Sequence, residues 1–353
     1  MDLSTADPDT VLDVLDRRLV CALQVDGRAE SGRIAEVLGV SVRTVTRRLT
    51  RMRRAGVLRV VRLPDVEDAA VGALLLRVRV LRGTVDAIAQ ALADRPDVPF
   101  VDVMLGGHEI GAVMLSDAGA RDRLLYGQLP ATTAVTETTT HAVLHAFADA
   151  GQWRAGHLTE EEAAALARPA APRAVPLPLD GLDRALLARL GEDARQSHAA
   201  LAVAVGAPES TVRRRLQRFD ETGLLRTHAT VDPRLLGMAV DANLWLDVLP
   251  GRLAEVGTAL ARHPQVHGVF ATSGPANLLA TLFCADHGGL YRFLTDTLGP
   301  LGVARAETTI TARAVKRAGV LLRRPGTPCA PARRELRARS PESPRPRAPL
   351  PAG

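Results

Sequence analysis

The N-terminal part of the chain contains apolar residues at helical spacing. Residues 31–38 carry apolar side chains at helical intervals, and Gly39 and Val40 predict a turn after them. Ser41 is the expected N-cap of a following helix. That helix has four apolar residues at intervals that predict one buried stripe: Val42, Val45, Leu49 and Met52. The pattern predicts a helix-turn-helix.

A segment with alternating faces follows. Residues 73–81 predict a strand with one buried face, formed by Leu74, Leu76, Val78 and Val80. A helical stretch at 84–94 ends before Pro96, and a glycine turn then joins two apolar runs into a hairpin. A further helix at 119–129 and a Thr-rich strand at 135–146 complete the order βαββαβ, which is the ferredoxin-like unit.

Both patterns occur twice. Residues 12–59 align without a gap to residues 179–226, and 20 of the 48 positions are identical. The alternating strand recurs after the second segment, with Ala242, Leu244, Leu246 and Val248 on one face. Two copies are too few for a solenoid, so the chain is predicted to hold a duplicated module.

Positive charge is concentrated in the first copy. Residues 41–62 hold eight arginines and no acidic residue, whereas residues 208–229 hold five arginines with Glu209, Asp220 and Glu221. A helix that lies in the major groove reads bases with outer residues near its N-terminus, and arginine is the commonest reader of guanine. The predicted DNA-binding residues are Ser41, Arg43, Thr44, Arg47, Arg48, Arg51, Arg54, Ser210, Thr211, Arg213, Arg214, Arg215 and Arg218. The alternative is an ordinary solvated basic face.

Other classes of protein are not indicated. No apolar run is long enough to span a membrane, and the polar, acidic N-terminus does not look like a secretory signal. The three cysteines lack metal-ligand spacing, and the histidines do not cluster with carboxylates, so neither a metal nor a cofactor is predicted. A cytoplasmic protein associated with the nucleoid is expected.

The repeated motif resembles the leucine-responsive regulator/AsnC (Lrp/AsnC) family of transcription factors. The first copy matches it at Leu12, Asp13, Asp16, Arg17, Asp26, Arg28, Gly39, Ser41, Thr44, Val45, Arg47, Arg48, Leu49 and Gly56, and the second copy matches at most of the equivalent positions. Pro208 departs from the pattern, because the family favours a capping serine there. The resemblance implies an α+β fold with two winged-type helix-turn-helix domains, each followed by a ferredoxin-like, RAM-type effector domain.

The resulting organisation has six parts. They are helix-turn-helix domain 1 (10–62), effector domain 1 (69–147), a linker (148–178), helix-turn-helix domain 2 (179–229), effector domain 2 (236–322) and a disordered basic tail (323–353). Family members usually hold one module and dimerise, so this chain resembles a covalent pseudo-dimer that can also form higher oligomers.

The resemblance also implies a small effector, such as an amino acid, bound at a glycine turn of each effector domain. The matching residues are Gly106, Gly107, His108, Glu109, Gly274, Pro275, Ala276 and Asn277. The family's usual aspartate is Glu109 in one turn and Asn277 in the other, which weakens the second turn as a site for an ammonium group. The alternative is that both turns are structural hairpins.

Together these features predict a sequence-specific transcriptional regulator that is not an enzyme and binds double-stranded DNA. Two alternatives remain: an enzyme resembling the siroheme decarboxylases, which look like paired modules of this fold, and a non-specific DNA-compacting protein. The two effector domains are expected to pair within one chain and bury Trp245, with Asp241 or Asp247 opposite Arg77 or Arg79. Pairing between the first domains of two chains is the alternative.

Overall fold

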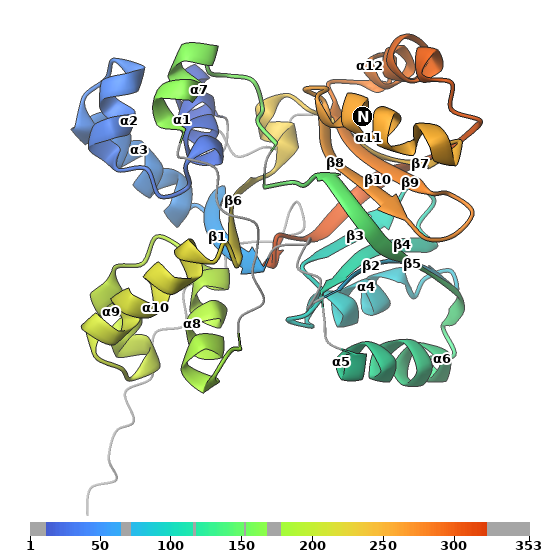
Figure 1. Ribbon diagram of the computed structural model, residues 1–353, viewed down its shortest axis with the longest axis horizontal. Helices are drawn as coiled ribbons and strands as arrows, with labels where there is room; N and C mark the ends of the chain where they lie inside the picture. The colour runs from blue at the N-terminus through green and yellow to red at the C-terminus, as the bar shows by residue number, and fades with distance from the viewer. Residues whose placement is uncertain (1–11, 65–71, 116–117, 152, 168–177, 323–353) are drawn as a thin grey trace, which may run out of the picture. The chain divides into compact units, whose positions relative to one another are not determined.

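The computed structural model describes residues 12–64, 72–115, 118–151, 153–167 and 178–322 (Figure 1). The basic tail predicted to be disordered at 323–353 lies outside the described residues.

The first helix-turn-helix contains α1 (Val14–Val25), α2 (Ser31–Leu38) and α3 (Val42–Arg54), followed by β1 (Leu58–Pro64). Gly39 ends α2 in the left-handed conformation at φ 66°, which glycine adopts without strain. Ser41 caps α3, since its Oγ accepts a hydrogen bond from the Thr44 backbone N–H. Val45, Leu49 and Met52 are buried as predicted, but Val42 is 51% exposed. Val42 is the first residue of α3, and the buried stripe begins one turn later.

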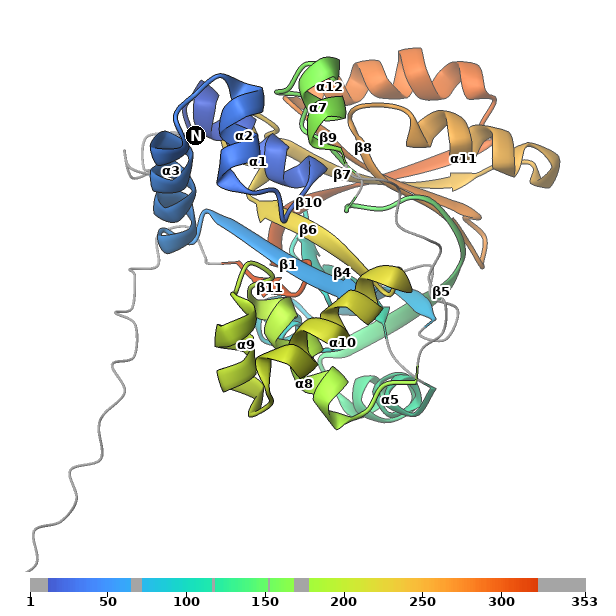
Figure 2. The same ribbon diagram turned by 60° about the vertical axis from the view of Figure 1, so that its left-hand side comes forward.

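The second helix-turn-helix repeats this order with α8 (Gly181–Glu192), α9 (His198–Val205), α10 (Glu209–Glu221) and β6 (Leu225–Val231). The strands β1 and β6 pair antiparallel, from Leu58 opposite Val231 to Pro64 opposite Leu225. They form a two-stranded ribbon between the two helix-turn-helix units (Figure 2). Each strand serves the other unit too: the backbone N–H of Ala194 donates to the Val60 carbonyl, and Val231 packs on the core of the first unit.

Two βαββαβ units follow. The first contains β2 (Ala73–Val80), α4 (Val85–Ala93), β3 (Phe100–Met104), β4 (Glu109–Leu115), α5 (Ala118–Asp122) continued by a π-helix (Arg123–Gln128) and α6 (Leu129–Ala131), and β5 (Val135–Ala148). The second contains 3-10 turns at Pro233–Leu236, Pro250–Arg252 and Gly299–Leu301, and β7 (Val240–Asp247), α11 (Leu253–Ala261), β8 (Val266–Thr272), β9 (Leu278–Cys284), α12 (His287–Arg292) continued by a π-helix (Phe293–Leu298), β10 (Arg305–Arg317) and β11 (Val320–Leu321).

The long final strand of each unit joins the two sheets. Residues 135–142 of β5 pair with β2 of their own unit, whereas residues 143–148 pair with β8 of the other unit. Likewise β10 pairs with β7 through 305–310 and with β3 through 311–316. Eight strands thus close into a ring, in the order β10-β3-β4-β2-β5-β8-β9-β7 and back to β10. Closure leaves no free sheet edge at these strands.

The predicted faces of the strands are confirmed. Leu76, Val78 and Val80 pack with α4 residues in the core of the first unit, and Ala242, Leu244 and Leu246 lie in the core of the second. The opposite faces meet inside the ring, where Trp245 packs with Leu75 and Leu279 and is only 7% exposed.

The predicted ion pairs across this interface are wrong. Arg77 pairs with Glu109 and Glu307, and its guanidinium carbon lies 5.2 Å from the centroid of the Trp245 ring. Asp241 pairs with Arg317 instead, because the end of β10 brings this arginine to the start of β7. Sequence alternation gives the face of a residue but not its partner on another strand.

Part of the segment expected to be a linker is packed against the domains. Trp153 Nε1 donates to the Pro264 carbonyl at 2.9 Å, and α7 (Glu160–Leu166) lies against α1 and α2. Arg18 pairs with Glu162, and Leu166 is buried in the core of the first helix-turn-helix.

No helix within the described ranges combines the length and apolarity needed to cross a bilayer. Cys21 and Cys284 are both buried and have free thiols.

Candidate functional site

The outer face of α3 carries free positive charge. Arg43, Arg47 and Arg54 are exposed and form no ion pair with any residue that the structure describes. Ser41 and Thr44 lie at the start of the same helix, where their hydroxyl oxygens are 2.9 Å apart. This face has the composition and exposure that phosphate and base contacts require.

Two other predicted DNA-binding residues on α3 have internal partners. Arg48 Nη1 donates to Asp16 Oδ1 at 3.0 Å, and Arg51 Nη2 donates to Asp16 Oδ2 at 2.5 Å. Asp16 is only 1% exposed, and it also accepts a hydrogen bond from the Asp13 backbone N–H at the start of α1. Two arginines of α3 therefore fix this helix to α1, a structural role that the sequence reasoning did not assign to them.

Asp13 belongs to the same network. Its side chain caps α1 by accepting from the Asp16 backbone N–H at 2.8 Å, and it pairs with Arg48. Partial burial raises the pKa of Asp13, but the hydrogen bonds from Arg48 and from the Asp16 N–H outweigh this effect and hold the pKa below its usual value.

The second helix-turn-helix has the same anchor. Asp180 and Asp183 cap α8, and Asp183 accepts from Arg215 Nη1 at 2.9 Å and from Arg218 Nη2 at 2.6 Å. Asp183 is fully buried. A D-x-x-D motif followed by R-x-x-R at the same separation in both copies was the sequence signal for this anchor.

The outer face of α10 differs from that of α3. Arg214 is exposed and has no ion pair with the described residues, but Arg213 pairs with Glu209 at 3.1 Å. Gln217 donates to Glu221 at 2.7 Å. Ser210 is exposed and Thr211 is half-buried, and Pro208 provides no side-chain cap. Among the described residues of this face Arg213 is paired and Arg214 is not, and Glu221 adds a negative charge that α3 lacks.

Acidic residues of the second copy also meet arginines of the first. Arg53 donates to Asp193 at 2.5 Å, and Asp220 pairs with Arg62 and lies 3.7 Å from Arg28. Arg62 is only 5% exposed, so its charge is directed into the contact between the two helix-turn-helix units.

The glycine turns lie at the junctions between the two βαββαβ units. In the first turn, the backbone N–H of Leu105 donates to the Ile310 carbonyl of the second unit at 2.7 Å. In the second turn, the N–H of Ser273 donates to the Ala142 carbonyl of the first unit at 2.9 Å. Gly106 and Gly274 have φ values of 114° and 102°, so both turns require glycine there.

The polar side chains of both turns already have protein partners. Glu109 is buried and accepts from Arg77 Nε at 2.8 Å and from Arg79 Nε at 3.3 Å. Burial lowers the pKa of Arg77, but hydrogen bonds to Glu307 and Glu109 outweigh this and raise its pKa. Asn277 donates to the Val248 carbonyl at 2.7 Å and accepts from the Val248 N–H at 3.0 Å. His108 is exposed, and Gly107, Pro275 and Ala276 complete the turns.

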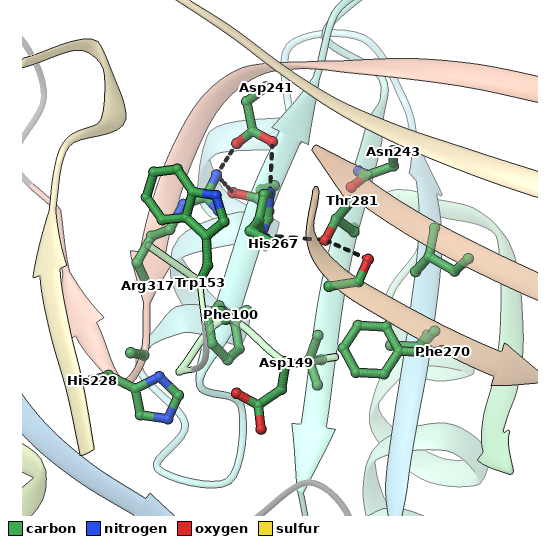
Figure 3. A pocket seen from close by; sticks show the side chains of 18 of the residues that line it. Phe100, Asp149, Trp153, His228, Asp241, Asn243, His267, Phe270, Thr281 and Arg317 are labelled. Atoms are coloured by element: carbon green, nitrogen blue, oxygen red, sulfur yellow. Dashed lines mark hydrogen bonds and ion pairs between the residues drawn. The ribbon is translucent and has the colours of Figure 1, made fainter. Parts of the chain in front are cut away.

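A cavity that the sequence reasoning missed lies inside the ring of strands. It has a volume of about 180 Å³ and is lined by Trp245, Leu279 and the β6 segment 228–231, among other residues. Figure 3 shows part of its lining, including His228 and Phe270. Four ionisable residues from four strands meet on its wall: Asp102, Asp241, His267 and Arg317. These residues are up to 215 positions apart (317 − 102 = 215), so their spacing gives no local signal.

Comparison with protein families gives the lineage of this architecture. Residues 12–53 and 179–219 match the AsnC-type helix-turn-helix domain, and residues 242–321 match the Lrp/AsnC ligand binding domain. An HTH-type transcriptional regulator of Pyrococcus horikoshii is 30% identical over 141 residues, which cover 39% of this chain and 89% of that protein. The chain belongs to the Lrp/AsnC family.

A second regulator and a solved structure are also similar to this chain. An HTH-type transcriptional regulator of Pyrococcus furiosus is 33% identical over 134 residues, covering 37% of this chain and 90% of that protein. Among solved structures, the siroheme decarboxylase NirDL superposes with a TM-score of 0.56 at 12% identity, covering 86% of this chain and 93% of that one. At this identity the likeness concerns the fold alone.

Proposed function

We propose that this Lrp/AsnC protein is a sequence-specific DNA-binding transcriptional regulator in which two family modules are fused into one chain. The main support for this proposal is the outer face of α3, where Arg43, Arg47 and Arg54 are exposed and form no ion pairs with described residues. Two other arginines of α3, Arg48 and Arg51, pair with the buried Asp16, so their charge is already compensated within the protein. Positive charge without an internal partner attracts the DNA backbone and gives arginine access to base edges.

The duplicated arrangement is part of the proposal. Residues 73–148 repeat the βαββαβ order of the matched ligand-binding domain, and the two units share strands in a closed ring. A pair that other family members would form from two chains is thus supplied within one. Association into higher oligomers remains a separate expectation, and so does a location in the cytoplasm at the nucleoid.

Within this pair, the two reading heads would contribute unequally. We assign base contacts mainly to Arg43 and Arg47, together with Ser41 and Thr44 at the start of α3. Arg214, Ser210 and Thr211 would give the second head a weaker contact, because Glu209 and Glu221 hold neighbouring polar groups there. Arg48, Arg51, Arg215 and Arg218 would act chiefly by fixing the helices.

An effector would regulate binding. The glycine turns at 106–109 and 274–277 remain candidates on the family resemblance, but Glu109 and Asn277 would have to exchange their protein partners for a ligand.

Of the alternatives, a decarboxylase acting on a tetrapyrrole is disfavoured by size. A cavity of about 150 Å³ holds one benzene molecule, and the internal cavity here has about 180 Å³. A tetrapyrrole is several times larger. If the purified protein nevertheless bound siroheme tightly and released carbon dioxide from it, the non-enzymatic proposal would be wrong.

The deciding experiment is selection of DNA from a random pool by the full chain, followed by affinity measurements on the enriched and a scrambled duplex. Wild-type protein is expected to enrich one motif. Arg47→Ala should lose most of the preference for it, while Gln217→Ala, on the outer face of α10, serves as the control. Equal affinity for all duplexes would instead favour non-specific DNA compaction.

A further inference from the structure

The internal cavity has two chemically different walls. One wall is apolar and is formed by a cluster in which Leu75, Trp245 and Leu279 are buried and Val113, Val143 and Phe270 pack beside them. The other wall carries Asp102, Asp241, His267 and Arg317. Figure 3 shows Asp241, His267 and Arg317 grouped together with Thr281. Small-molecule sites are typically apolar cavities with a few convergent polar groups.

The polar wall contains hydrogen-bonding atoms that no described residue satisfies. Asp102 Oδ1 lies 3.2 Å from Arg317 Nη2 but has no hydrogen-bond partner. His267 Nε2 is also without one, at 3.7 Å from Asp241 Oδ1, although His267 is only 7% exposed. An unsatisfied buried polar atom costs about 1–3 kcal/mol, so such atoms call for a partner.

The charges of the polar wall determine which kind of ligand it can bind. Two carboxylates, Asp102 and Asp241, face one guanidinium, Arg317, which pairs with Asp241. Burial lowers the pKa of His267, so it brings no positive charge near neutral pH. The cluster therefore lacks one positive charge, and an ionised Asp102 would be a buried acceptor with free lone pairs.

When no ligand is bound, protonation of Asp102 removes the uncompensated negative charge of the cluster. Burial raises the pKa of Asp102 to about 7, against the opposing effect of Arg317, and the neighbouring Asp241 raises it further. A bound cation would replace that proton.

The geometry points to a binding site for a small organic amine, with its ammonium group against Asp102 and Asp241 and its apolar body against Trp245 and Leu279. The body should be about the size of one benzene ring, judged from the cavity of about 150 Å³ that benzene fills. This site is distinct from the glycine turns, whose polar groups bond to Arg77, Arg79 and Val248.

The same cavity adjoins the DNA-binding half. Its lining includes Leu63 of β1 and residues 228–231 of β6, the two strands of the ribbon that follow α3 and α10. The cavity that would hold the ligand is therefore bounded in part by this ribbon. Its effect on DNA affinity rests on the proposed function, whereas its binding to the cavity does not.

Binding can be tested with three probes of similar size and different charge: 2-phenylethylamine, 3-phenylpropionate and ethylbenzene. Trp153 and Trp245, the two tryptophans of the chain, both line the cavity, so intrinsic fluorescence reports on occupancy and calorimetry gives the Kd. The amine is expected to bind at least tenfold more tightly than the other two probes. Equal or tighter binding of the carboxylate, or no binding of any probe, would overturn the proposal.

Variants locate the site. Asp102→Asn should weaken binding of the amine at least tenfold and leave ethylbenzene unchanged. Asp97→Asn is the matched control, because Asp97 pairs with Arg95 and does not line the cavity. Ala73→Met, which fills the cavity with a side chain from β2, should abolish binding of both the amine and ethylbenzene even if Asp102→Asn fails to fold. Unchanged amine affinity in Ala73→Met would place binding elsewhere.

Proton exchange supplies an independent readout. Because Asp102 must lose its proton to accept an ammonium group, amine affinity should rise between pH 6 and pH 8, and calorimetry in buffers of different ionisation enthalpy should show proton release. Binding without proton release would contradict the role of Asp102. DNA affinity, measured with and without the amine, is a separate arm: amine binding in a protein that prefers no DNA sequence would refute only the proposed function.

Discussion

The two helix-turn-helix units share their framework and differ on their outer faces. In both, a buried aspartate of the first helix, Asp16 or Asp183, pairs with two arginines of the third helix, α3 or α10. On the outer face, Arg47 of α3 corresponds to Arg214 of α10, but Arg54 corresponds to Glu221 and Thr50 to Gln217. What the copies retain in common is therefore the anchor that orients the helix, and what they do not share is the charge offered to a partner.

The unshared charges fit a division of labour. Acidic residues of the second copy face arginines of the first across their contact, at Asp193 with Arg53 and at Asp220 with Arg62. These ion pairs hold the second unit beside the first. They also compensate positive charge that would otherwise cause repulsion at the contact between the two units. The second unit is thus suited to position the first, while Arg43, Arg47 and Arg54 of α3 form no ion pair with any described residue.

The largest expected effect tests the shared framework. Asp16→Asn removes the charge that two arginines bond to, and Asp183→Asn does the same in the second copy. Hydrogen bonds to charged groups contribute about 1.5–3 kcal/mol each, so each variant should lower the free energy of unfolding by about 3 kcal/mol. Chemical denaturation measures both losses. A large loss in one copy and none in the other would show that the anchor is not shared.

The outer faces should respond differently. Arg47→Ala is expected to weaken binding to the preferred DNA by about 2 kcal/mol and to relax the sequence preference, since a base contact contributes about 1–3 kcal/mol. Gln217→Ala should change affinity by less than about 0.5 kcal/mol, as expected for a surface substitution. Fluorescence anisotropy with specific and scrambled duplexes measures both. If Arg47→Ala weakens both duplexes equally, Arg47 contacts phosphate and not bases.

Equivalent positions in the ring of strands also differ in charge, and the pH dependence of stability reveals this difference. Asp102 in β3 corresponds to Phe270 in β8, 168 residues later (270 − 102 = 168). Since burial raises the pKa of Asp102 to about 7 in the folded protein, above about 3.9 in the unfolded chain, its contribution is fully present below pH 4 and is lost as pH rises through 7. Relative to Asp102→Asn, the wild type should lose about 2 kcal/mol between pH 5 and pH 8.

The comparison with Asp102→Asn is needed because other groups titrate in the same region. His267 has a lowered pKa and favours stability at higher pH, while Asp241 has a lowered pKa and favours it above acidic pH. Both remain in the variant. A stability difference that stays constant with pH would show that Asp102 is ionised throughout.

Local patterns predicted most of the fold, since helix stripes and strand alternation depend on neighbours in sequence. The alternation in β7 correctly placed Trp245 inside, yet it could not give the partners of Asp241 and Arg77, which depend on the pairing of strands far apart in the chain. Val42 was assigned to the core on periodicity, but it precedes the first buried turn of α3. The cavity escaped prediction because its polar wall is assembled from four strands.

The sequence carries a further signal for two of the arginines. Charge alone groups Arg48 and Arg51 with the DNA-binding residues, whereas the repeated pairing of D-x-x-D with R-x-x-R in both copies indicates a structural role. The glycine turns were recognised from the resemblance, but the hydrogen bonds of Asn277 to Val248 depend on the three-dimensional arrangement of β7 and β9.

The smallest expected effect concerns the helix caps, where the copies differ by one residue. Ser41 Oγ accepts from the Thr44 N–H, whereas Pro208 at the equivalent position offers no side-chain acceptor. Ser41→Ala should cost about 1 kcal/mol, as loss of an N-cap usually does. Pro208→Ser should add a cap to α10, but it also releases the restricted backbone of proline in the unfolded chain, which offsets part of the gain. The net stabilisation by Pro208→Ser should therefore be below 1 kcal/mol, about 0.5 kcal/mol, in thermal and chemical unfolding. A destabilised Pro208→Ser would mean that the rigidity of proline stabilises α10 more than a capping hydroxyl can.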